Sequence, residues 1–253
     1  MSQFSTAPTV VFNADACVGI VVALPEELAT LTSVKLKQGD CRQIGTHWVA
    51  YAGAGFHNAA NAAQLLADKG VHSLISWGCA AGLAADVKPG DLLLPSQIDN
   101  GAQQFDTDSR LSASLCQTLP NTIRVHSGKL YSSDRLVSSS QEKRGIHDQT
   151  HALGLDMESV AIADVALRAN LPFMAVRSIA DPVSQTLPNA VIQALNKQGR
   201  VELLKLLRYL FWHPVEIKAL IQLGLHFHAA QKTLNIVARG LNKKIRYVPA
   251  PAN

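Results

Sequence analysis

The chain has 253 residues, a length that suits one large α/β domain, or one domain with an appendage. Apolar residues make up 47% and charged residues 17%, an ordinary globular balance that excludes long disordered regions. The net charge of +4 is unevenly distributed, because residues 197–253 hold ten Lys and Arg against two acidic residues. This asymmetry predicts that the C-terminal part contacts something anionic.

The cysteines and the apolar runs bear on where the protein resides. Cys17, Cys41, Cys79 and Cys116 form no CxxC pair and have no metal-ligand spacing, so we expect a reduced, cytoplasmic compartment. Residues 1–16 read as a loose leader without the basic and apolar regions of a signal peptide. No apolar run reaches the ~18–20 residues that a membrane span needs, although attachment to a membrane surface stays open.

The first predicted elements alternate between strand and helix. Residues 17–23 form a continuous β-prone apolar run, as in a strand buried on both faces. A helical stretch is expected to follow the turn at Pro25. A second strand is expected over 47–52, and an Ala-rich helix over 58–69, ending before Gly70.

The chain then contains two short strands and a long unassigned region. A buried strand is predicted over 73–77, followed by a loop of small residues over 78–82. The sequence of 88–91 is a strong turn signal before a strand at 92–94. The polar region 97–150 receives no assignment.

From residue 153 the pattern becomes regular again. A strand over 153–156 leads into a helix over 159–169, and residues 173–180 predict another buried strand. Strands that alternate with helices predict an α/β fold with a mostly parallel central sheet flanked by helices.

The chain changes character in its last quarter. Residues 199–241 are predicted to be helical, with a break at His213 and Pro214. We therefore expect an α/β domain over 17–196 and a basic amphipathic helical C-terminal extension over 197–253, which is not an independent domain.

Acidic residues follow three of the predicted strands. Glu26 and Glu27 come after the first strand, Asp156 and Glu158 after the strand at 153–156, and Asp181 after the last strand. In open α/β sheets, ligands bind beyond the carboxyl ends of the strands. A single acid there is more often a helix cap or a solvated loop residue, but three such acids in one sheet predict a functional site.

Four segments resemble motifs of the nucleoside phosphorylase and nucleosidase superfamily, in particular those of the methylthioadenosine/S-adenosylhomocysteine nucleosidases. Val18–Glu27 (VGIVVALPEE) resembles their N-terminal strand and acidic turn. Ser76–Leu83 (SWGCAAGL), with VKPGD at 87–91, is similar to their glycine-rich loop and following turn. Asp156–Ser159 (DMES) resembles their ribose-binding motif, and Val176–Asp181 (VRSIAD) the strand that bears the base-protonating aspartate.

The order and spacing of these motifs agree with the superfamily over about residues 17–190. This resemblance implies a nucleoside phosphorylase-like fold and cleavage of the N-glycosidic bond between a purine and ribose. A narrower resemblance covers nearly the whole chain: DMES, Ile179–Pro182 (IADP), Thr186–Pro188 (TLP) and the basic, apolar tail resemble the hopanoid-associated phosphorylases, or adenosylhopane nucleosidases. It implies release of adenine from adenosylhopane in bacterial hopanoid side-chain biosynthesis.

The resemblance implies roles for five residues around the bond that breaks. Asp181 is implied to be the general acid that protonates N7 of the departing adenine, which requires a raised pKa. Glu158 is implied to accept hydrogen bonds from the ribose hydroxyls, and Glu27 to activate the attacking water. Met157 is expected to pack against the sugar or base, unless it is an ordinary core methionine. Asp156 is expected to bind substrate or only to orient Glu158.

Four further positions are expected at the substrate. Gly78, at the start of the small-residue run, is expected to let the backbone approach the sugar or the nucleophile closely. Cys79 stands where nucleosidases commonly have Ser, and we expect a buried filler and not a nucleophile, since no His is evidently paired with it. Leu136 and Val137 match, with a one-residue gap, the segment whose backbone recognises adenine.

Water is the expected acceptor of the ribosyl group. Phosphorylases of the superfamily bind phosphate with several arginines, whereas the first turn here is LPEE, whose carboxylates would repel phosphate. Arg177 precedes Asp181 on its strand, and Arg42 or Arg135 could reach the site, so phosphorolysis of the same substrate stays an alternative. No feature of the sequence calls for a metal or an organic cofactor.

The segment 197–246 has two explanations. Residues 203–212 crowd Leu, Phe and Trp together with Lys205 and Arg208, a pattern typical of a helix that lies on an anionic bilayer. A lipid-tailed nucleoside would need such a docking surface at the inner membrane. The same helices could instead pack on the sheet or form a dimer interface. We expect a homo-oligomer, because relatives are commonly dimers or larger.

Three functions are therefore compared. The first is an adenosylhopane nucleosidase that is peripheral on the membrane. The second is a soluble nucleosidase acting on methylthioadenosine, S-adenosylhomocysteine or futalosine. The third is a non-catalytic protein that binds a nucleoside or a lipid. The long basic tail favours the first, and the combination of Glu27, Glu158 and Asp181 argues against the third. Nucleic acid is not an expected partner.

Overall fold

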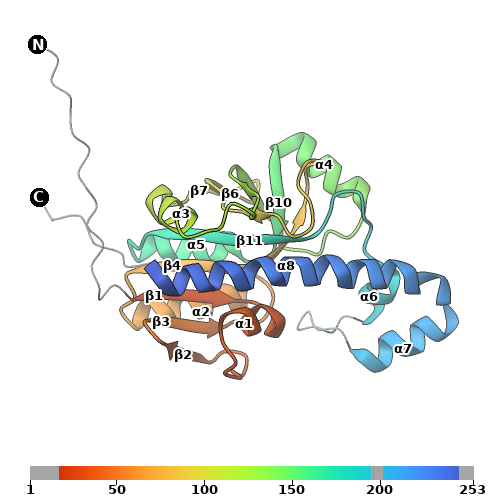
Figure 1. The fold of residues 1–253 in the computed structure, drawn as a ribbon, viewed down its shortest axis with the longest axis horizontal. Helices are drawn as coiled ribbons and strands as arrows, with labels where there is room; N and C mark the ends of the chain where they lie inside the picture. The colour runs from red at the N-terminus through yellow and green to blue at the C-terminus, as the bar shows by residue number, and fades with distance from the viewer. Residues whose placement is uncertain (1–16, 195, 197–201, 245–253) are drawn as a thin grey trace, which may run out of the picture.

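The structure is a computed structural model that describes residues 17–194, 196 and 202–244. The predicted leader at 1–16 lies outside the described residues. The centre of the molecule is an eleven-stranded sheet in the order β2-β3-β1-β4-β10-β9-β6-β7, with β11 paired to β4, then β5 and β8 (Figure 1). The strands are β1 (Val18–Val22), β2 (Cys41–Ile44), β3 (His47–Tyr51), β4 (Ser73–Gly82), β5 (Leu92–Leu93), β6 (Gln97–Asp99), β7 (Gln104–Asp106), β8 (Val125–His126), β9 (Lys129–Ser132), β10 (Ala152–Asp156) and β11 (Phe173–Asp181).

The middle of the sheet is parallel, as expected from the alternation of strands and helices. β3, β1, β4 and β11 all run in the same direction. Antiparallel pairs join β2 to β3, β10 to β4, β5 to β11 and β7 to β6, so the whole sheet is mixed. The α/β fold with a central sheet flanked by helices is confirmed.

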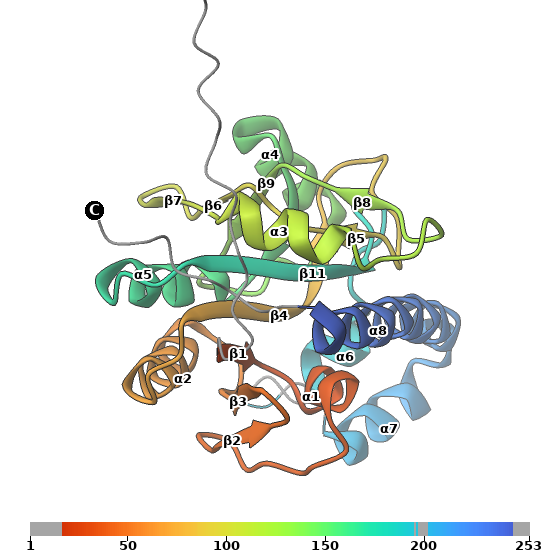
Figure 2. The same cartoon turned by 60° about the vertical axis from the view of Figure 1, so that its left-hand side comes forward.

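Two hydrophobic cores lie on the two faces of the sheet. Successive side chains of a strand point to opposite faces. In β1, Val21 therefore joins one core, whereas Ile20 and Val22 join the other. Figure 2 shows the helices α2 (Phe56–Asp68) and α5 (Ser159–Arg168) on one side of the central strands, and α1 (Pro25–Leu31) and α8 (Ile217–Lys244) on the other.

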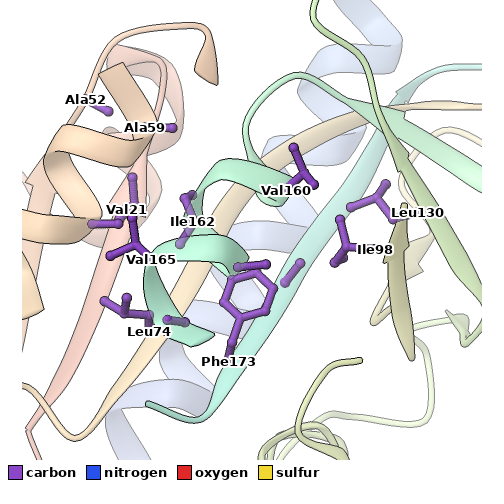
Figure 3. Packing of buried hydrophobic residues seen from close by; sticks show 14 of the residues in the cluster. Val21, Ala52, Ala59, Leu74, Ile98, Leu130, Val160, Ile162, Val165 and Phe173 are labelled. Carbon is purple, nitrogen blue, oxygen red and sulfur yellow. The ribbon is translucent and has the colours of Figure 1, made fainter. Parts of the chain in front are cut away.

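The first core is filled by apolar side chains from α2, α5 and the strands. Val160, Ile162 and Val165 of α5 face the sheet residues Leu74 and Phe173 (Figure 3). This packing explains why the sequence of 159–169 predicts a helix, because the helix buries one apolar stripe against the sheet.

One predicted loop is wrong. Residues 78–82 do not form a loop but continue β4 to Gly82. Gly78 and Cys79 pair with Arg177 and Ser178 of β11, so backbone hydrogen bonds to a neighbouring strand hold the segment. Its small residues reflect a close approach, since a Cβ on Gly82 would lie 3.3 Å from Ile179 Cγ2.

The unassigned region 97–150 contains β6 to β9 and two helices, α3 (Ser109–Cys116) and α4 (Ser140–Thr150). Its strands have two to four residues each. Such short strands carry almost no periodicity of their own. Their formation depends on partners elsewhere in the sheet, such as β9 pairing with both β6 and β10.

The C-terminal part consists of α6 (Asn189–Ala194), α7 (Leu203–Trp212), a 3₁₀ turn η1 (Pro214–Glu216) and α8. The break lies at His213 and Pro214, where the sequence predicted it. The second half of α8 packs on the sheet: Leu234, Val237 and Leu241 belong to the second core. The first half of α8 projects beyond the sheet with α6 and α7 (Figure 1). No helix among the described residues is both long and apolar enough to span a bilayer.

Candidate active site

A cavity of about 540 Å³ opens where β1, β10 and β11 end. Four acidic residues line it: Glu27 from α1, Asp156 from the end of β10, Glu158 from the β10–α5 junction, and Asp181 from the last position of β11. The structure thus brings together acids that follow three of the predicted strands. Most of the other lining is apolar, and it includes Leu24, Leu136, Val137, Leu155, Met157 and Leu187.

Glu27 is a buried carboxylate whose two oxygens both accept backbone hydrogen bonds. Oε1 accepts one from the N–H of Cys79 (2.8 Å), and Oε2 accepts one from Leu24 (3.0 Å) and one from Ala23 (3.2 Å). Burial raises the pKa of Glu27, whereas the charge of Arg177 and these hydrogen bonds oppose the rise. The group is therefore held in one orientation, at the entrance of α1. Its neighbour Glu26 is exposed.

Glu158 is also buried, and it lies beside a glycine turn. Its Oε1 accepts a hydrogen bond from the N–H of Gly55 (3.0 Å), a residue with φ +95° that a side chain would strain. Its Oε2 accepts a bond from the N–H of Met157 (3.3 Å). Burial, followed by the nearby charge of Asp156, raises the pKa of Glu158 to about 7. Glu158 thus changes its charge close to neutral pH.

Asp156 is fully engaged with protein partners. Its Oδ2 lies 2.6 Å from Nη2 of Arg177, and its Oδ1 accepts a hydrogen bond from Oγ of Ser132 (2.6 Å). The backbone N–H of Ser159 also donates to the carboxylate. Asp156 also lines the cavity, so it stands beside the substrate space while protein partners hold its carboxylate.

Arg177 connects the acids behind the cavity. Its guanidinium is buried and donates to the hydroxyls of Ser76 (2.6 Å) and Ser159 (3.1 Å) as well as to Asp156. Arg177 does not line the described cavity. The sequence suggested an anion-binding role for this arginine, whereas the structure uses its charge to balance buried carboxylates.

Gly78 lies behind the carboxylate of Glu27. A Cβ at this position would be 2.3 Å from Glu27 Oε1 and 2.5 Å from Arg177 Nη1. Gly78 is not among the lining residues. The side chains of Glu27 and Arg177 approach the backbone closely here, and the approach of the sugar stays a prediction.

The other predicted positions divide into two groups. Cys79, Leu136, Val137 and Met157 line the cavity. Burial raises the pKa of the Cys79 thiol well above its ordinary value, so it stays protonated, and its backbone N–H is the part that contacts Glu27. Arg42 and Arg135 do not line the cavity, and Arg135 forms an ion pair with Glu142.

Lys143 is a residue at the site that the sequence did not single out. Its side chain is fully buried, and Nζ donates to Oδ2 of Asp181 and to the carbonyls of Gln185 (2.8 Å) and Pro182 (3.2 Å). Burial raises the pKa of Asp181, and the ammonium of Lys143 opposes this rise. Lysine is rarely buried, and this one occurs in a polar helix, so periodicity gave no sign of it.

Comparisons with known proteins identify the family of this chain. The family model described as the phosphorylase superfamily matches residues 18–208. A 5′-methylthioadenosine/S-adenosylhomocysteine nucleosidase from Desulfotalea psychrophila is 27% identical over 200 residues, which are 67% of this chain and 86% of that protein.

Solved structures share the fold. The 5′-methylthioadenosine/S-adenosylhomocysteine nucleosidase of Neisseria meningitidis, in complex with methylthio-immucillin-A, has a TM-score of 0.67 and 19% identity, covering 90% of this chain and 100% of that one. Futalosine hydrolase of Helicobacter pylori has a TM-score of 0.64 and 18% identity, covering 90% and 96%. Since the family model covers most of the chain and includes all four cavity acids, this protein belongs to the phosphorylase superfamily and is an enzyme of that family.

Proposed function

We propose that this enzyme hydrolyses the N-glycosidic bond of an adenine nucleoside, and that the natural substrate is adenosylhopane. The observation that carries the proposal is the meeting of Glu27, Glu158 and Asp181 in one cavity. Cleavage at C1′ of ribose passes through a cationic sugar, as glycoside hydrolysis does. It needs a proton for the leaving base, negative charge near the sugar, and a nucleophile on the opposite face.

The three carboxyl groups divide these tasks. Asp181, protonated, gives its proton to N7 as the C1′–N9 bond breaks and its electron pair moves into the base. Glu158, ionised, accepts hydrogen bonds from the ribose hydroxyls, and its charge favours the cationic sugar over the neutral substrate. Glu27 takes a proton from water while the water oxygen bonds to C1′. The products are adenine and a ribose that carries a new hydroxyl.

The charges around the cavity favour water over phosphate. No Lys or Arg is among the described residues that line the cavity, and this holds for Arg42 and Arg135 too. Arg177 and Lys143 are each committed to a carboxylate. An incoming phosphate would meet carboxylates without a free cation, and this repulsion in a partly desolvated site is costly.

The exposed apolar residues of the C-terminal helices support a lipid-linked substrate. Phe211, Trp212 and Val215 are 78%, 72% and 84% exposed, and Ile221 and Leu225 of α8 are also exposed. Monomeric soluble surfaces rarely gather so many large apolar groups. A nucleoside with a hydrocarbon tail reaches the enzyme from a bilayer, so we infer that this surface docks on the inner membrane.

Apolar area contributes more to this docking than charge does. Lys205, Arg208 and Lys218 are exposed in the same region, but Lys205 is paired with Glu202 at 3.0 Å. The polybasic attraction inferred from the whole segment 197–253 is therefore only partly available there. Residues 197–201 and 245–246, which hold three of the basic groups, lie outside the described residues.

The decisive experiment is product analysis with purified enzyme and adenosylhopane in mixed micelles. Chromatography after incubation with and without inorganic phosphate should show adenine and ribosylhopane in both reactions. A phosphorylated ribose that depends on added phosphate would establish phosphorolysis instead.

The second candidate is a nucleosidase for small soluble nucleosides, favoured by the likeness to a methylthioadenosine/S-adenosylhomocysteine nucleosidase and a futalosine hydrolase. Release of adenine from methylthioadenosine at a kcat/KM above that for adenosylhopane would support this candidate and contradict the lipid-linked substrate.

A further inference from the structure

The contacts of Lys143 place a second functional group beside the proposed general acid. Its side chain is 0% exposed and comes from α4, an element outside the motifs that the sequence suggested. An ammonium has three N–H groups, and Nζ has three acceptors: Asp181 Oδ2 and the carbonyls of Pro182 and Gln185. Every donor of the lysine is therefore used, and the ammonium is fixed.

These contacts also fix Asp181 and the segment that follows it. The two carbonyls belong to Pro182 and Gln185, one and four residues after Asp181, so a single ammonium joins the carboxyl group to its own chain segment. Asp181 Oδ2 is bound to Lys143, while Oδ1 is buried without a partner among the residues that the structure describes. The carboxyl group thus has one committed oxygen and one unsatisfied oxygen.

We propose that Lys143 is a positioning residue for the general acid: it holds Asp181 beside the cavity and stabilises the carboxylate that remains after the proton has moved to the base. This inference rests on the proposed function. Before the step, Asp181 is neutral and Lys143 is charged. After the step, N7 of the base carries the proton, and the ionised Asp181 forms an ion pair with Lys143.

A fixed ammonium makes proton donation easier. Burial alone would keep the proton on Asp181 too tightly, since an isolated carboxylate is poorly solvated there. The neighbouring positive charge favours the ionised form of Asp181 and so lowers the pKa of this group, which makes it a better proton donor. His226 of α8 acts in the same direction on Asp181, and the acids Glu27, Asp156 and Glu158 line the same cavity.

The test is the pH dependence of adenine release by Lys143→Met, which keeps most of the length of the side chain and removes the charge. We expect kcat to fall roughly 10- to 100-fold with a small change in KM, as for an impaired general acid. We also expect the basic limb of the kcat/KM profile to move to higher pH by about one unit, because Asp181 loses a neighbouring cation.

The matched control is Lys129→Met. Lys129 also pairs with an aspartate, Asp99 at 3.0 Å, but it does not line the cavity. This variant should keep both the rate and the position of the basic limb. Should Lys143→Met fail to fold, Lys143→Ala with added propylamine provides the second measurement, in which partial recovery of kcat is expected.

Two results would overturn the inference. One is a Lys143→Met enzyme with a wild-type basic limb, since a residue needed only for packing changes stability and not the pH profile. The other is a folded Lys143→Ala enzyme that shows no recovery with the amine. Neither depends on the proposed reaction failing, because that failure would be seen in the wild-type enzyme as absence of adenine release.

Discussion

Asp181 and Glu158 are buried in the same cavity, yet the proposed reaction needs them in opposite protonation states. Burial raises the pKa of both groups, to about 7 for Glu158. Activity requires Glu158 ionised and Asp181 protonated, so we expect a bell-shaped kcat/KM profile. The acid limb should reflect Glu158, with the rate falling below about pH 7. The basic limb should reflect Asp181, because the mechanism requires this group to keep its proton where Glu158 is ionised.

Substitution separates the two limbs. Asp181→Asn keeps the shape of the side chain and removes the proton, so adenine release should fall by about 10²–10⁴-fold. Binding of a nucleoside analogue, measured by calorimetry, should change little. A variant that released adenine at the wild-type rate would exclude Asp181 as the general acid.

Glu158 also predicts a dependence of stability on pH. Its pKa rises from an ordinary value of 4.5 to about 7 on folding, so the folded state binds the proton more tightly. The contribution of this group to stability is fully present below about pH 4.5 and is lost as the pH rises through about 7. Glu158→Gln should therefore be more stable than the wild type at pH 8, by on the order of 2–3 kcal/mol, and similar at pH 4.5.

Denaturant unfolding at the two pH values measures this difference. The variant should also lose activity, since an amide brings no negative charge to the cationic sugar. Equal free energies of unfolding for both proteins at pH 8 would mean that the ionised carboxylate of Glu158 does not destabilise the folded state.

At the scale of elements, β4 connects the fold to the site. Its residues 78 and 79 lie against Glu27 and Arg177. Position 78 therefore has no room for a side chain where the two charged groups meet. Gly78→Ala should separate Glu27 from Arg177 or displace β4. We expect a lower melting temperature and at least a 10-fold loss of activity, because overpacking costs about 1–3 kcal/mol.

Gly145→Ala is the control for this substitution. It lies in α4, and a Cβ there meets nothing within 4 Å. Alanine should be neutral or slightly stabilising in a helix. If Gly78→Ala kept wild-type activity and melting temperature, the close contact behind Glu27 would not be essential.

The same strand shows what could be predicted from the sequence and what could not. Long apolar runs such as 17–23 and 173–180 predicted buried strands, and the acids that follow these runs line the cavity. The extension of β4 through Gly78–Gly82 could not be predicted, since Gly and Ala have low β-propensity. The segment forms a strand because it pairs with β11, which is distant in the sequence.

Lys143 shows a second limit. A buried lysine is satisfied by acceptors far away in the chain, here 38 to 42 residues on. Neither periodicity nor local spacing carries that information. The motifs found the carboxyl groups that face the substrate, but not the cation that holds one of them.

At the scale of the whole molecule, the C-terminal extension has two different parts. Ala230, Leu234 and Leu241 in the second half of α8 are buried in the core on the sheet, whereas Phe211 and Trp212 of α7 are exposed. Removing residues 197–253 would expose the apolar face formed by Leu92, Met174 and Val176. We therefore expect such a truncated chain to be insoluble or to lack a cooperative thermal transition in differential scanning calorimetry.

A truncated chain that melted cooperatively and released adenine would show that α8 is dispensable for the fold. Otherwise, truncation cannot be used to test membrane docking, because loss of binding would follow from loss of folding. Surface substitutions in α7 leave the core contacts of α8 in place and test docking alone.

The double variant Phe211→Ser/Trp212→Ser should bind membranes less while keeping the site intact. Each side chain is largely exposed, so its loss removes no core contact, whereas burying both in a bilayer would contribute several kcal/mol to binding. Co-sedimentation with vesicles of phosphatidylglycerol and phosphatidylethanolamine should fall by at least 10-fold, while adenine release from a water-soluble nucleoside stays unchanged.

Leu167→Ser is the matched control, because Leu167 is 68% exposed on α5, away from the C-terminal helices. Equal sedimentation of the double variant and the wild type would mean that α7 does not face the bilayer, and a concentration-dependent change in oligomeric state would instead identify this surface as an interface between subunits.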